Sequence, residues 1–456
     1  MSDRARRHRW WILGAMGSAM GLVLLDETVV GVALPTIARD LGLSQTAGHW
    51  VINAYLLVFT GLAAAAGKLG DIFDIRDLYL VGLALFGGAS LACGFAQSEA
   101  WIIAFRALQG VGGALIFPLS IAIIPKVFEP QERSLAYGIN TAFGSVFLAL
   151  GPFAGGFFTE VLSWRWIFWI NLPVLAVNFL IMSFLWERAA RRGERQAASG
   201  PFDLAGLFAL LIAMGAIVLA VMQGEDWGWS SFATLGSFAL GLVAAAAFIV
   251  IEQRRANPLF HLTLFENATF SAVNLVSFFG QFVKLTAVVF GAFYLQERLG
   301  ISPLLAGALL LAGIAPSLPV ALLVGRLDRR LGLRRTILIG LSVTAVGQTG
   351  LVGGVLLDLP ALFVAGLVLW GSSVPLHFVP PRRAVMNIVR PDQQGQTGGI
   401  NLTAQLLGGT VAIAVMSALY AATQDYALLF AVSGFLGLAT LLLCLRFVSD
   451  AAVGDG

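Results

Sequence analysis

Long runs of apolar residues, separated by short polar segments, repeat along the whole chain. A helix needs about 20 apolar residues to cross a bilayer, and fourteen runs approach or exceed that length. The runs are continuous, whereas strands of a membrane barrel show a weaker alternation of apolar and polar positions. The pattern therefore predicts an all-α membrane protein with fourteen transmembrane helices. These lie at approximately 10–34, 49–67, 78–97, 100–124, 134–158, 165–186, 203–223, 231–251, 268–295, 303–325, 335–356, 360–381, 397–421 and 427–447.

The composition supports this prediction and excludes several classes of protein. The 456 residues are 58% hydrophobic and 12% charged, with a mean hydropathy of +0.86, whereas soluble proteins carry roughly 25% charged residues. So few charges cannot cover a soluble surface, which argues against a soluble enzyme or a nucleic-acid-binding protein. Cys93 and Cys444 lie in apolar runs, so the sequence supports neither a disulfide framework nor a metal cluster.

The basic residues predict the orientation of the spans. With the N-terminus in the cytoplasm, the cytoplasmic segments hold 23 of the 28 Lys and Arg residues, as the positive-inside rule requires. The basic segment 1–9 is therefore interpreted as a topology signal, rather than as a cleavable signal peptide or a nucleic-acid patch. We expect a multi-pass protein of the bacterial-type cytoplasmic (inner) membrane, with both termini in the cytoplasm.

An internal repeat divides the chain. Shifted by about 258 residues, the sequence matches itself in collinear order, as in 41–44 with 299–302 and 138–140 with 399–401. The repeat predicts a six-helix bundle at 1–190, a linker plus two-helix insert at 191–257 and a second six-helix bundle at 258–456. Pseudo-symmetric bundles of this kind are typical of transporters, which place their site near the bilayer midplane between the two halves.

Four ionisable residues lie within the predicted spans: Asp26, Glu27, Arg106 and Lys284. Ionisable groups are costly inside a bilayer and mark functional sites. Asp26 and Lys284 occupy equivalent positions in the repeat, so we expect Lys284 to face Asp26 or Glu27 across a central cavity. Neighbouring helix positions point about 100° apart, so one carboxylate is expected to pair while the other stays free to titrate, with Glu27 the more accessible.

Further polar residues accompany these four. Arg106 and Gln109 lie one turn apart, and because Arg does not deprotonate we expect Arg106 to tune a neighbouring carboxylate. A structural role is the alternative to coupling or substrate contact for Asp26, Arg106 and Lys284. Five polar residues are candidates for the substrate path, although a hydrogen bond between helices is equally expected for each: Asn53, Tyr55, Gln281, Gln296 and His377.

Short motifs in five places resemble those of the major facilitator superfamily, and in particular its fourteen-span drug:proton antiporter family. The resemblance covers essentially the whole chain. The chain departs from the family pattern at Gly31, where Asn is usual, and at Ile72 and Asp74, where the gate motif usually has Arg and Gly. The motifs lie at 25–35 in span one, 67–71 after span two, 106–113 in span four, 151–156 in span five and 164–173 at the start of span six.

The segment 67–71 and its second copy at 325–330 resemble the superfamily's gate motif. In such a loop, Gly permits a tight turn and Asp meets a helix N-terminus or basic neighbours. We expect Asp71 to act as this cap and latch; in the second copy the Asp lies one position early. The gate-motif residues that the resemblance implies are Gly67, Gly70, Asp71, Arg76, Gly325, Asp328 and Arg329.

Two further motifs carry expectations for function. The segment 106–113 resembles the motif that the family links to proton transfer. The segment 151–156 resembles the antiporter motif, with Gly151, Pro152, Gly155 and Gly156. Small residues at positions 151 and 155 favour close helix packing, and the same face is expected to serve as a hinge or leak-tight interface.

The resemblance implies a proton-coupled antiporter that exports hydrophobic or amphipathic small molecules by alternating access, and not an enzyme. The sequence contains no phosphate-binding loop for ATP, so a proton gradient without any cofactor or metal is the expected energy source. The expected partners are a small-molecule substrate, protons and membrane lipids, with no nucleic acid, and the expected state is a monomer. Two alternatives remain: a transporter of a specific metabolite or lipid, by uptake or flipping, and a transport-dead membrane sensor.

Overall fold

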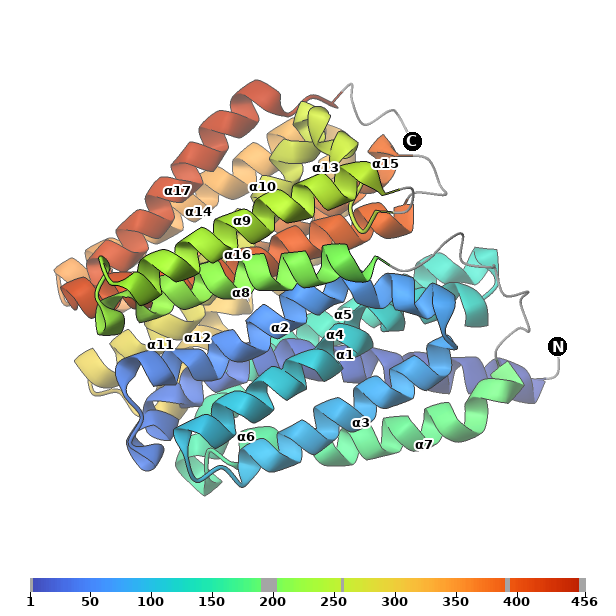
Figure 1. Cartoon of the computed structure of the whole chain (residues 1–456), viewed down its shortest axis with the longest axis horizontal. Helices are drawn as coiled ribbons and strands as arrows, with labels where there is room; N and C mark the ends of the chain where they lie inside the picture. Colours follow the sequence, from blue (N-terminus) through green and yellow to red (C-terminus); the bar gives the residue numbers. More distant parts are fainter. Residues whose placement is uncertain (1–2, 190–202, 256–257, 390–393, 451–456) are drawn as a thin grey trace.

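The computed structural model describes residues 3–189, 203–255, 258–389 and 394–450. Helices occupy all fourteen predicted spans and run side by side (Figure 1). Thirteen helices in the described ranges are long and apolar enough to cross a membrane, and α2 covers the remaining predicted span. The helices of the first six spans are α1 Asp3–Leu41, α2 Gln45–Ile72, α3 Ile75–Gly94, α4 Glu99–Val127, α5 Pro130–Phe157 continued by η1 Phe158–Leu162, and α6 Trp166–Trp169 with α7 Asn171–Ala189.

The remaining spans follow the same alternation of long helices and short turns. The insert consists of α8 Leu204–Trp227 and α9 Phe232–Arg254, and η2 Leu262–Glu266 connects it to span nine. The helices of the last six spans are α10 Ala268–Leu285 with η3 Thr286–Phe290, α11 Gly291–Phe293 and η4 Tyr294–Arg298, α12 Pro303–Ile314 with α13 Ser317–Leu331, α14 Leu333–Leu356, α15 Pro360–Ile388, α16 Gln394–Thr423 and α17 Tyr426–Phe447.

Span nine is interrupted near the middle of its length. The α-helix α10 ends one residue after Lys284 and continues as the π-helical segment η3. Such segments are rare and often occur at functional sites. On α1, a Cβ at Gly31 would lie 3.0 Å from Val289 of η3, so the Gly that replaces the family's usual Asn allows the two helices to approach closely.

The helices of each half of the chain pack mainly against one another. In the first half, α1 packs against α5 and α7, while α4 packs against α2 and α3. In the second half, α10 packs against α15 and α16, and α14 packs against α15 and α17. Two long contacts then join the halves, between α2 and α16 and between α5 and α12. This arrangement surrounds α1 and α10 with other helices, and 89% of the apolar window of each span is buried.

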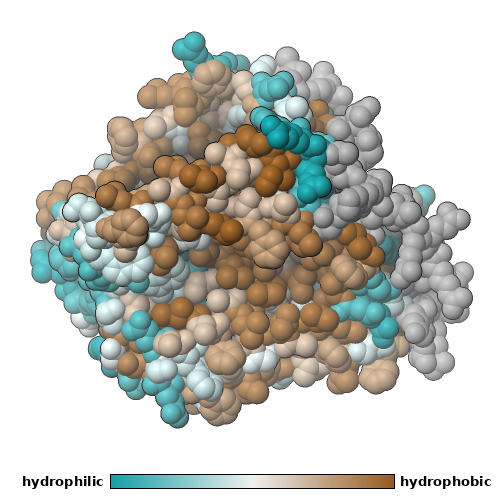
Figure 2. Space-filling model, viewed as in Figure 1, coloured by the Kyte–Doolittle hydropathy of each residue, from teal (hydrophilic) through white to brown (hydrophobic). Residues whose placement is uncertain are grey.

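The insert helices α8 and α9 pack against each other, and α8 also contacts α2 and α16. The pair therefore lies along the seam where the two halves meet, which Figure 1 shows across the front of the molecule. Figure 2 shows a broad hydrophobic surface on this face, with hydrophilic residues gathered toward its two ends. An apolar belt between polar ends is the surface that a bilayer-spanning protein requires.

Candidate functional site

Asp26 is held inside the first half of the chain. Its Oδ2 lies 2.5 Å from Nη1 of Arg106, and its Oδ1 accepts a hydrogen bond of 2.9 Å from Gln109. Asp26, Arg106 and Gln109 are fully buried. The spacing of Arg106 and Gln109 on α4 places both side chains on one helix face, because residues three apart are neighbours on a helix. The carboxylate on α1 therefore has two donors from α4.

Arg106 also binds groups other than Asp26. Its Nε donates to the backbone oxygen of Val51 on α2 at 2.8 Å, and its Nη1 donates to Gln109 at 2.7 Å. The guanidinium carbon lies 4.4 Å from the ring centroid of Tyr55, which is a cation–π geometry. Arg106 thus links α1, α2 and α4, and it is the basic partner of Asp26 within the first half.

Glu27 faces the other half of the chain. Its Oε1 lies 3.1 Å from Nζ of Lys284 on α10 and accepts a hydrogen bond from Gln281, one turn earlier on the same helix. Glu27 is 1% exposed and Lys284 is 3% exposed. Within the described residues, Oε2 of Glu27 has no hydrogen-bond partner. This ion pair therefore joins the two halves at a point shielded from solvent.

The structure corrects one part of the expected arrangement. A charge pair between span one and Lys284 was predicted, and the structure assigns it to Glu27 rather than Asp26. The prediction that one carboxylate stays free, with Glu27 the more accessible, is wrong for this conformation, because both are paired and buried. The reason is Arg106, whose side chain reaches Asp26 from α4. Spacing along α1 alone does not reveal this second partner.

Among the five predicted substrate-path residues, all of which the structure describes, Gln281 alone is hydrogen-bonded to a carboxylate of α1, that of Glu27. Asn53 instead lies 2.9 Å from the sulfur of Met222 on α8, and Tyr55 donates to the backbone oxygen of Val23 at 3.1 Å. Asn53 therefore contacts the insert. Tyr55 contacts the central cluster, which consists of Asp26, Glu27, Arg106 and Lys284 with their hydrogen-bond partners, only through its ring, which faces Arg106.

Gln296 and His377 lie elsewhere in the second half. Gln296 donates to the backbone oxygen of Val32 at 2.8 Å and so joins span nine to α1. His377 on α15 lies 3.3 Å from Thr344 on α14. Both residues therefore make the helix–helix hydrogen bonds that were the equal alternative to lining a path.

Sequence reasoning missed two polar residues that support the cluster. Ser90 on α3 accepts hydrogen bonds from Gln109 at 3.4 Å and from Asn171 on α7 at 2.9 Å. Gln405 on α16 extends the cross-half pair by donating to Gln281 at 3.5 Å. The available signal was a polar residue inside an apolar run, and Asn171 also lies in the span-six motif, but neither feature shows what the side chain contacts.

The gate motif adopts a conformation different from the predicted loop. The helix α2 continues to Ile72, so the segment 67–71 is helical, and the turn follows at residues 73 and 74. The cap of the next helix is Asp74, which accepts from the backbone nitrogens of Arg76 and Asp77. The helix that follows is therefore capped by Asp74, and the expected cap and latch contacts of Asp71 involve a side chain outside the described ones. The side chains at 67 and 71 lie outside the described ones, and Gly70 approaches Leu119 of α4.

The other gate-motif residues bind within their own halves. Arg76 donates to the backbone oxygens of Met182 and Ser183 on α7. In the second copy, which is also helical within α13, Asp328 lies 2.9 Å from Arg383 of α15. Gly325 and Arg329 of this copy lie one turn apart on α13, and a Cβ at position 325 would be 3.9 Å from Nη1 of Arg329.

The antiporter motif forms two close contacts. A Cβ at Gly151 would lie 1.9 Å from the side chain of Thr28 on α1. A Cβ at Gly155 would lie 2.5 Å from the backbone oxygen of Val29 on the same helix. The structure therefore shows the predicted close packing of this face. A Cβ at Gly156 would lie 2.2 Å from the backbone oxygen of Pro303 on α12, so this residue meets the second half instead. Pro152 lies between these faces, and its carbonyl oxygen approaches Gly307 of α12.

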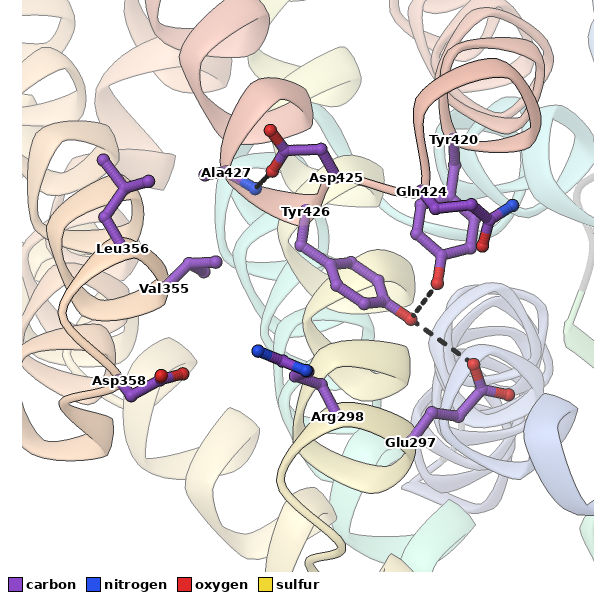
Figure 3. Close-up of a pocket in the computed structure, with 10 residues that line it drawn as sticks. All are labelled: Glu297, Arg298, Val355, Leu356, Asp358, Tyr420, Gln424, Asp425, Tyr426 and Ala427. Atoms are coloured by element: carbon purple, nitrogen blue, oxygen red, sulfur yellow. Dashed lines mark hydrogen bonds between the residues drawn. The ribbon is translucent and has the colours of Figure 1, made fainter.

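A polar pocket of about 490 Å³ lies at the ends of spans predicted to face the outside. Figure 3 shows Tyr426 at its centre, where the hydroxyl is bonded to Glu297 at 3.3 Å and to Tyr420 at 2.9 Å, with Arg298 nearby. A second pocket shares Glu297, Tyr420 and Gln424 and extends to α1 and α2. Neither pocket includes the buried carboxylates of α1, so the central cluster and the outer pockets are separate sites.

Comparisons with known proteins agree with this architecture. The profile described as Major Facilitator Superfamily matches residues 16–283 and 270–454. The multidrug resistance protein Stp of Mycobacterium tuberculosis is 33% identical over 410 residues, which are 90% of this chain and 75% of Stp. The puromycin resistance protein pur8 of Streptomyces alboniger is 33% identical over 421 residues, covering 90% of this chain and 81% of pur8. The multidrug transporter protein MdtP of Bacillus subtilis is 33% identical over 332 residues, which are 72% of this chain but only 60% of MdtP.

Solved structures share the fold at low sequence identity. A peptide transporter POT in complex with sulfate superposes with a TM-score of 0.71 at 16% identity, over 96% of this chain and 94% of the transporter. A D-xylose-proton symporter superposes with a TM-score of 0.69 at 15% identity, over 97% and 99% of the two chains. These likenesses support the helical arrangement of the whole chain.

Proposed function

The chain belongs to the major facilitator superfamily, and from that premise we propose that it is a proton-coupled antiporter that exports hydrophobic or amphipathic small molecules. It is a multi-pass integral membrane protein, and its relatives carry names that denote multidrug transport and antibiotic resistance. Export by alternating access requires a group whose proton affinity differs between the two states of the transporter. The two carboxylates of α1 are the candidates for this group.

The observation that carries the proposal is the buried ion pair between Glu27 and Lys284. It joins the two halves, and its members lie on helices that must move relative to each other when the halves rock. Adding a proton to Glu27 removes the charge that holds Lys284, so protonation and rearrangement of the halves are linked. Asp26 differs because its partner Arg106 lies in the same half. Rocking of the halves therefore leaves the Asp26 pair intact while it breaks or forms the Glu27 pair.

The closed contact between α5 and α12 is the outer barrier of the proposed export cycle. Gly156 and Gly307 let the two helices meet backbone to backbone near the ends that are predicted to face outward. Leu304 adds a hydrogen bond of 2.8 Å to Glu160 across the same contact. In the proposed cycle, this contact opens when protons enter from outside and substrate leaves, and it closes again as the proton passes to the cytoplasm.

The remaining parts of the proposal concern the surroundings of the protein. The substrate is a hydrophobic or amphipathic small molecule, and the driving force is a proton gradient without a cofactor. Membrane lipids are the other partners, nucleic acid is not one, and the protein works as a monomer. It resides in a bacterial-type inner membrane with both termini in the cytoplasm, as the distribution of basic residues favours.

Transport in proteoliposomes with an imposed pH gradient tests this function. Puromycin and a fluorescent lipophilic cation serve as substrates, and the wild type is compared with Asp26→Asn and Glu27→Gln. We expect gradient-driven movement by the wild type and loss of the gradient dependence in Glu27→Gln. The control is Glu99→Gln, which removes an exposed carboxylate at the end of α4 and is expected to leave transport unchanged. Substrate transport that does not depend on the pH gradient, or no transport of either substrate, contradicts the proposal.

A further inference from the structure

Two buried carboxylates, Asp203 and Glu252, lie at the ends of the two insert helices on the predicted cytoplasmic side. Asp203 is the N-cap of α8, and its Oδ1 accepts a hydrogen bond of 2.9 Å from the backbone nitrogen of Gly206. Glu252 lies in the last turn of α9, and its Oε2 accepts a hydrogen bond of 2.8 Å from the backbone nitrogen of Phe260. Asp203 is 2% exposed and Glu252 is 3% exposed. Each residue therefore uses one oxygen to hold the local backbone.

The second oxygen of each carboxylate points to the same place. Within the described residues, Oδ2 of Asp203 and Oε1 of Glu252 are buried and have no hydrogen-bond partner. A Cβ added at Gly206 would lie 2.8 Å from Oδ2 and 2.6 Å from Oε1. Both oxygens thus lie within 2.8 Å of one point, in the space that the absence of a side chain at position 206 leaves open.

Two basic side chains lie near the pair: Arg255 beside Asp203, and Lys68, which attracts Glu252 electrostatically. Nε of Arg255 lies 3.5 Å from Oδ1 of Asp203, and its side chain is half exposed; the neighbouring Arg254 is exposed. The ammonium of Lys68 on α2 donates to the backbone oxygen of Pro258. Burial and the nearby Lys68 lower the pKa of His261, so its imidazole adds no charge at neutral pH.

We propose that Asp203 and Glu252 bind one proton between them, as an O–H···O hydrogen bond between a carboxylic acid and a carboxylate. Two ionised carboxylates whose oxygens approach the same point repel each other, and sharing one proton removes the repulsion. The proton also supplies the donor that both unpartnered oxygens lack, which a buried polar atom requires. This site lies at the cytoplasmic ends of α8 and α9, separate from Asp26 and Glu27, and it does not depend on the proposed antiport.

The proton-binding pair is connected to the gate motif. Glu252 holds the connector between α9 and span nine at Phe260, and the same connector accepts a hydrogen bond from Lys68 at Pro258. Loss of the proton leaves two facing carboxylates. Their repulsion separates the ends of α8 and α9 and displaces the connector. The insert therefore transmits the proton occupancy of this site to the cytoplasmic end of α2.

Infrared difference spectroscopy of the full chain in lipid nanodiscs tests the proposal, because a protonated carboxyl group has a separate C=O stretching band. We expect the wild type at neutral pH to show a carboxylic-acid band that Asp203→Asn and Glu252→Gln each lose, with an intensity of one group per chain. Gly206→Ala keeps both carboxyl groups but fills the space between their oxygens, so its band should shift or disappear. Glu225→Gln, at the exposed opposite end of α8, is the control and should keep the band.

The outcomes separate this site from the antiporter mechanism. A band that disappears in either isosteric variant but persists in Asp26→Asn and Glu27→Gln supports the proposal, whatever the transport assay shows. A wild-type spectrum without a carboxylic-acid band, or spectra of Asp203→Asn and Glu252→Gln that retain it in full, overturns the proposal. If one of these variants does not fold, the other and Gly206→Ala each still decide the question.

Discussion

Replacing Lys284 by Met is the most direct test of the ion pair that joins the halves. Met is similar in length to Lys and apolar, so Lys284→Met removes the charge while filling the space. Glu27 then keeps one donor, Gln281, and its Oε2 already lacks a partner. Because both members of the pair are at most 3% exposed, removing one leaves a buried charge without its counter-charge. Such a change costs about 3–5 kcal/mol of stability.

The double variant Glu27→Gln with Lys284→Met removes both charges. Replacing a buried ion pair by neutral groups is often neutral or stabilising, so we expect the double variant to regain most of the lost stability. The double-mutant cycle should then give a coupling energy at or above about 3 kcal/mol, the upper end of the range found for residues in contact. The double variant should still fail to couple transport to the pH gradient, because it lacks the titrating carboxylate.

The assay is reversible unfolding in lipid–detergent mixtures, measured beside pH-driven transport. Lys126→Met is the control, because Lys126 is exposed at the cytoplasmic end of α4 and should change stability by less than about 0.5 kcal/mol. A single variant as stable as the control, or a coupling energy near zero, refutes the pairing of Glu27 with Lys284.

Three further predictions concern the neighbouring groups. Arg106→Lys loses the guanidinium geometry that reaches Asp26, Gln109 and α2 together, so it should destabilise the protein by about 3 kcal/mol in the same unfolding assay. Asp26→Asn should leave Arg106 buried without its counter-charge and cost a similar amount, while an unchanged midpoint would exclude the pair. Gly156→Ala forces a methyl group against the backbone oxygen of Pro303, so the outer contact should open, with overpacking of about 1–3 kcal/mol and greater labelling of outward-facing cysteine probes. Gly138→Ala on the same helix is its control, because a Cβ there meets nothing within 4 Å, and equal labelling of the two variants would contradict the prediction.

The sequence predicted most of the fold because its signals are local. Apolar runs of bilayer length are visible in one dimension, and all fourteen of them are helical in the structure. The repeat also predicted that spans one and nine are equivalent, and both are largely buried. The gate motif shows the limit of this reasoning, since a Gly and an Asp suggested a turn at 67–71, whereas α2 extends to Ile72 and Asp74 caps the next helix. A helix begins where a capping side chain is available, and the sequence offers two Asp residues close together, Asp71 and Asp74.

The candidate site was predicted in its members but not in its connections. Asp26, Glu27, Arg106 and Lys284 stand out in the sequence because each is an ionisable residue within an apolar run. Which acid meets which base depends on the rotation of α1 against α4 and α10. Adjacent residues point about 100° apart, so a small rotation of the helix exchanges their partners.

The sequence by itself therefore determined the membrane environment, the span order, the two-fold plan and the few residues that carry charge inside the membrane. The tertiary structure decided that Asp26 is bound within one half, that Glu27 joins the two halves, and that Asp203 and Glu252 meet over Gly206. The physical reason is that burial of an apolar run depends on its own composition. A charge pair instead depends on two side chains, far apart in the chain, arriving within a few ångströms of each other.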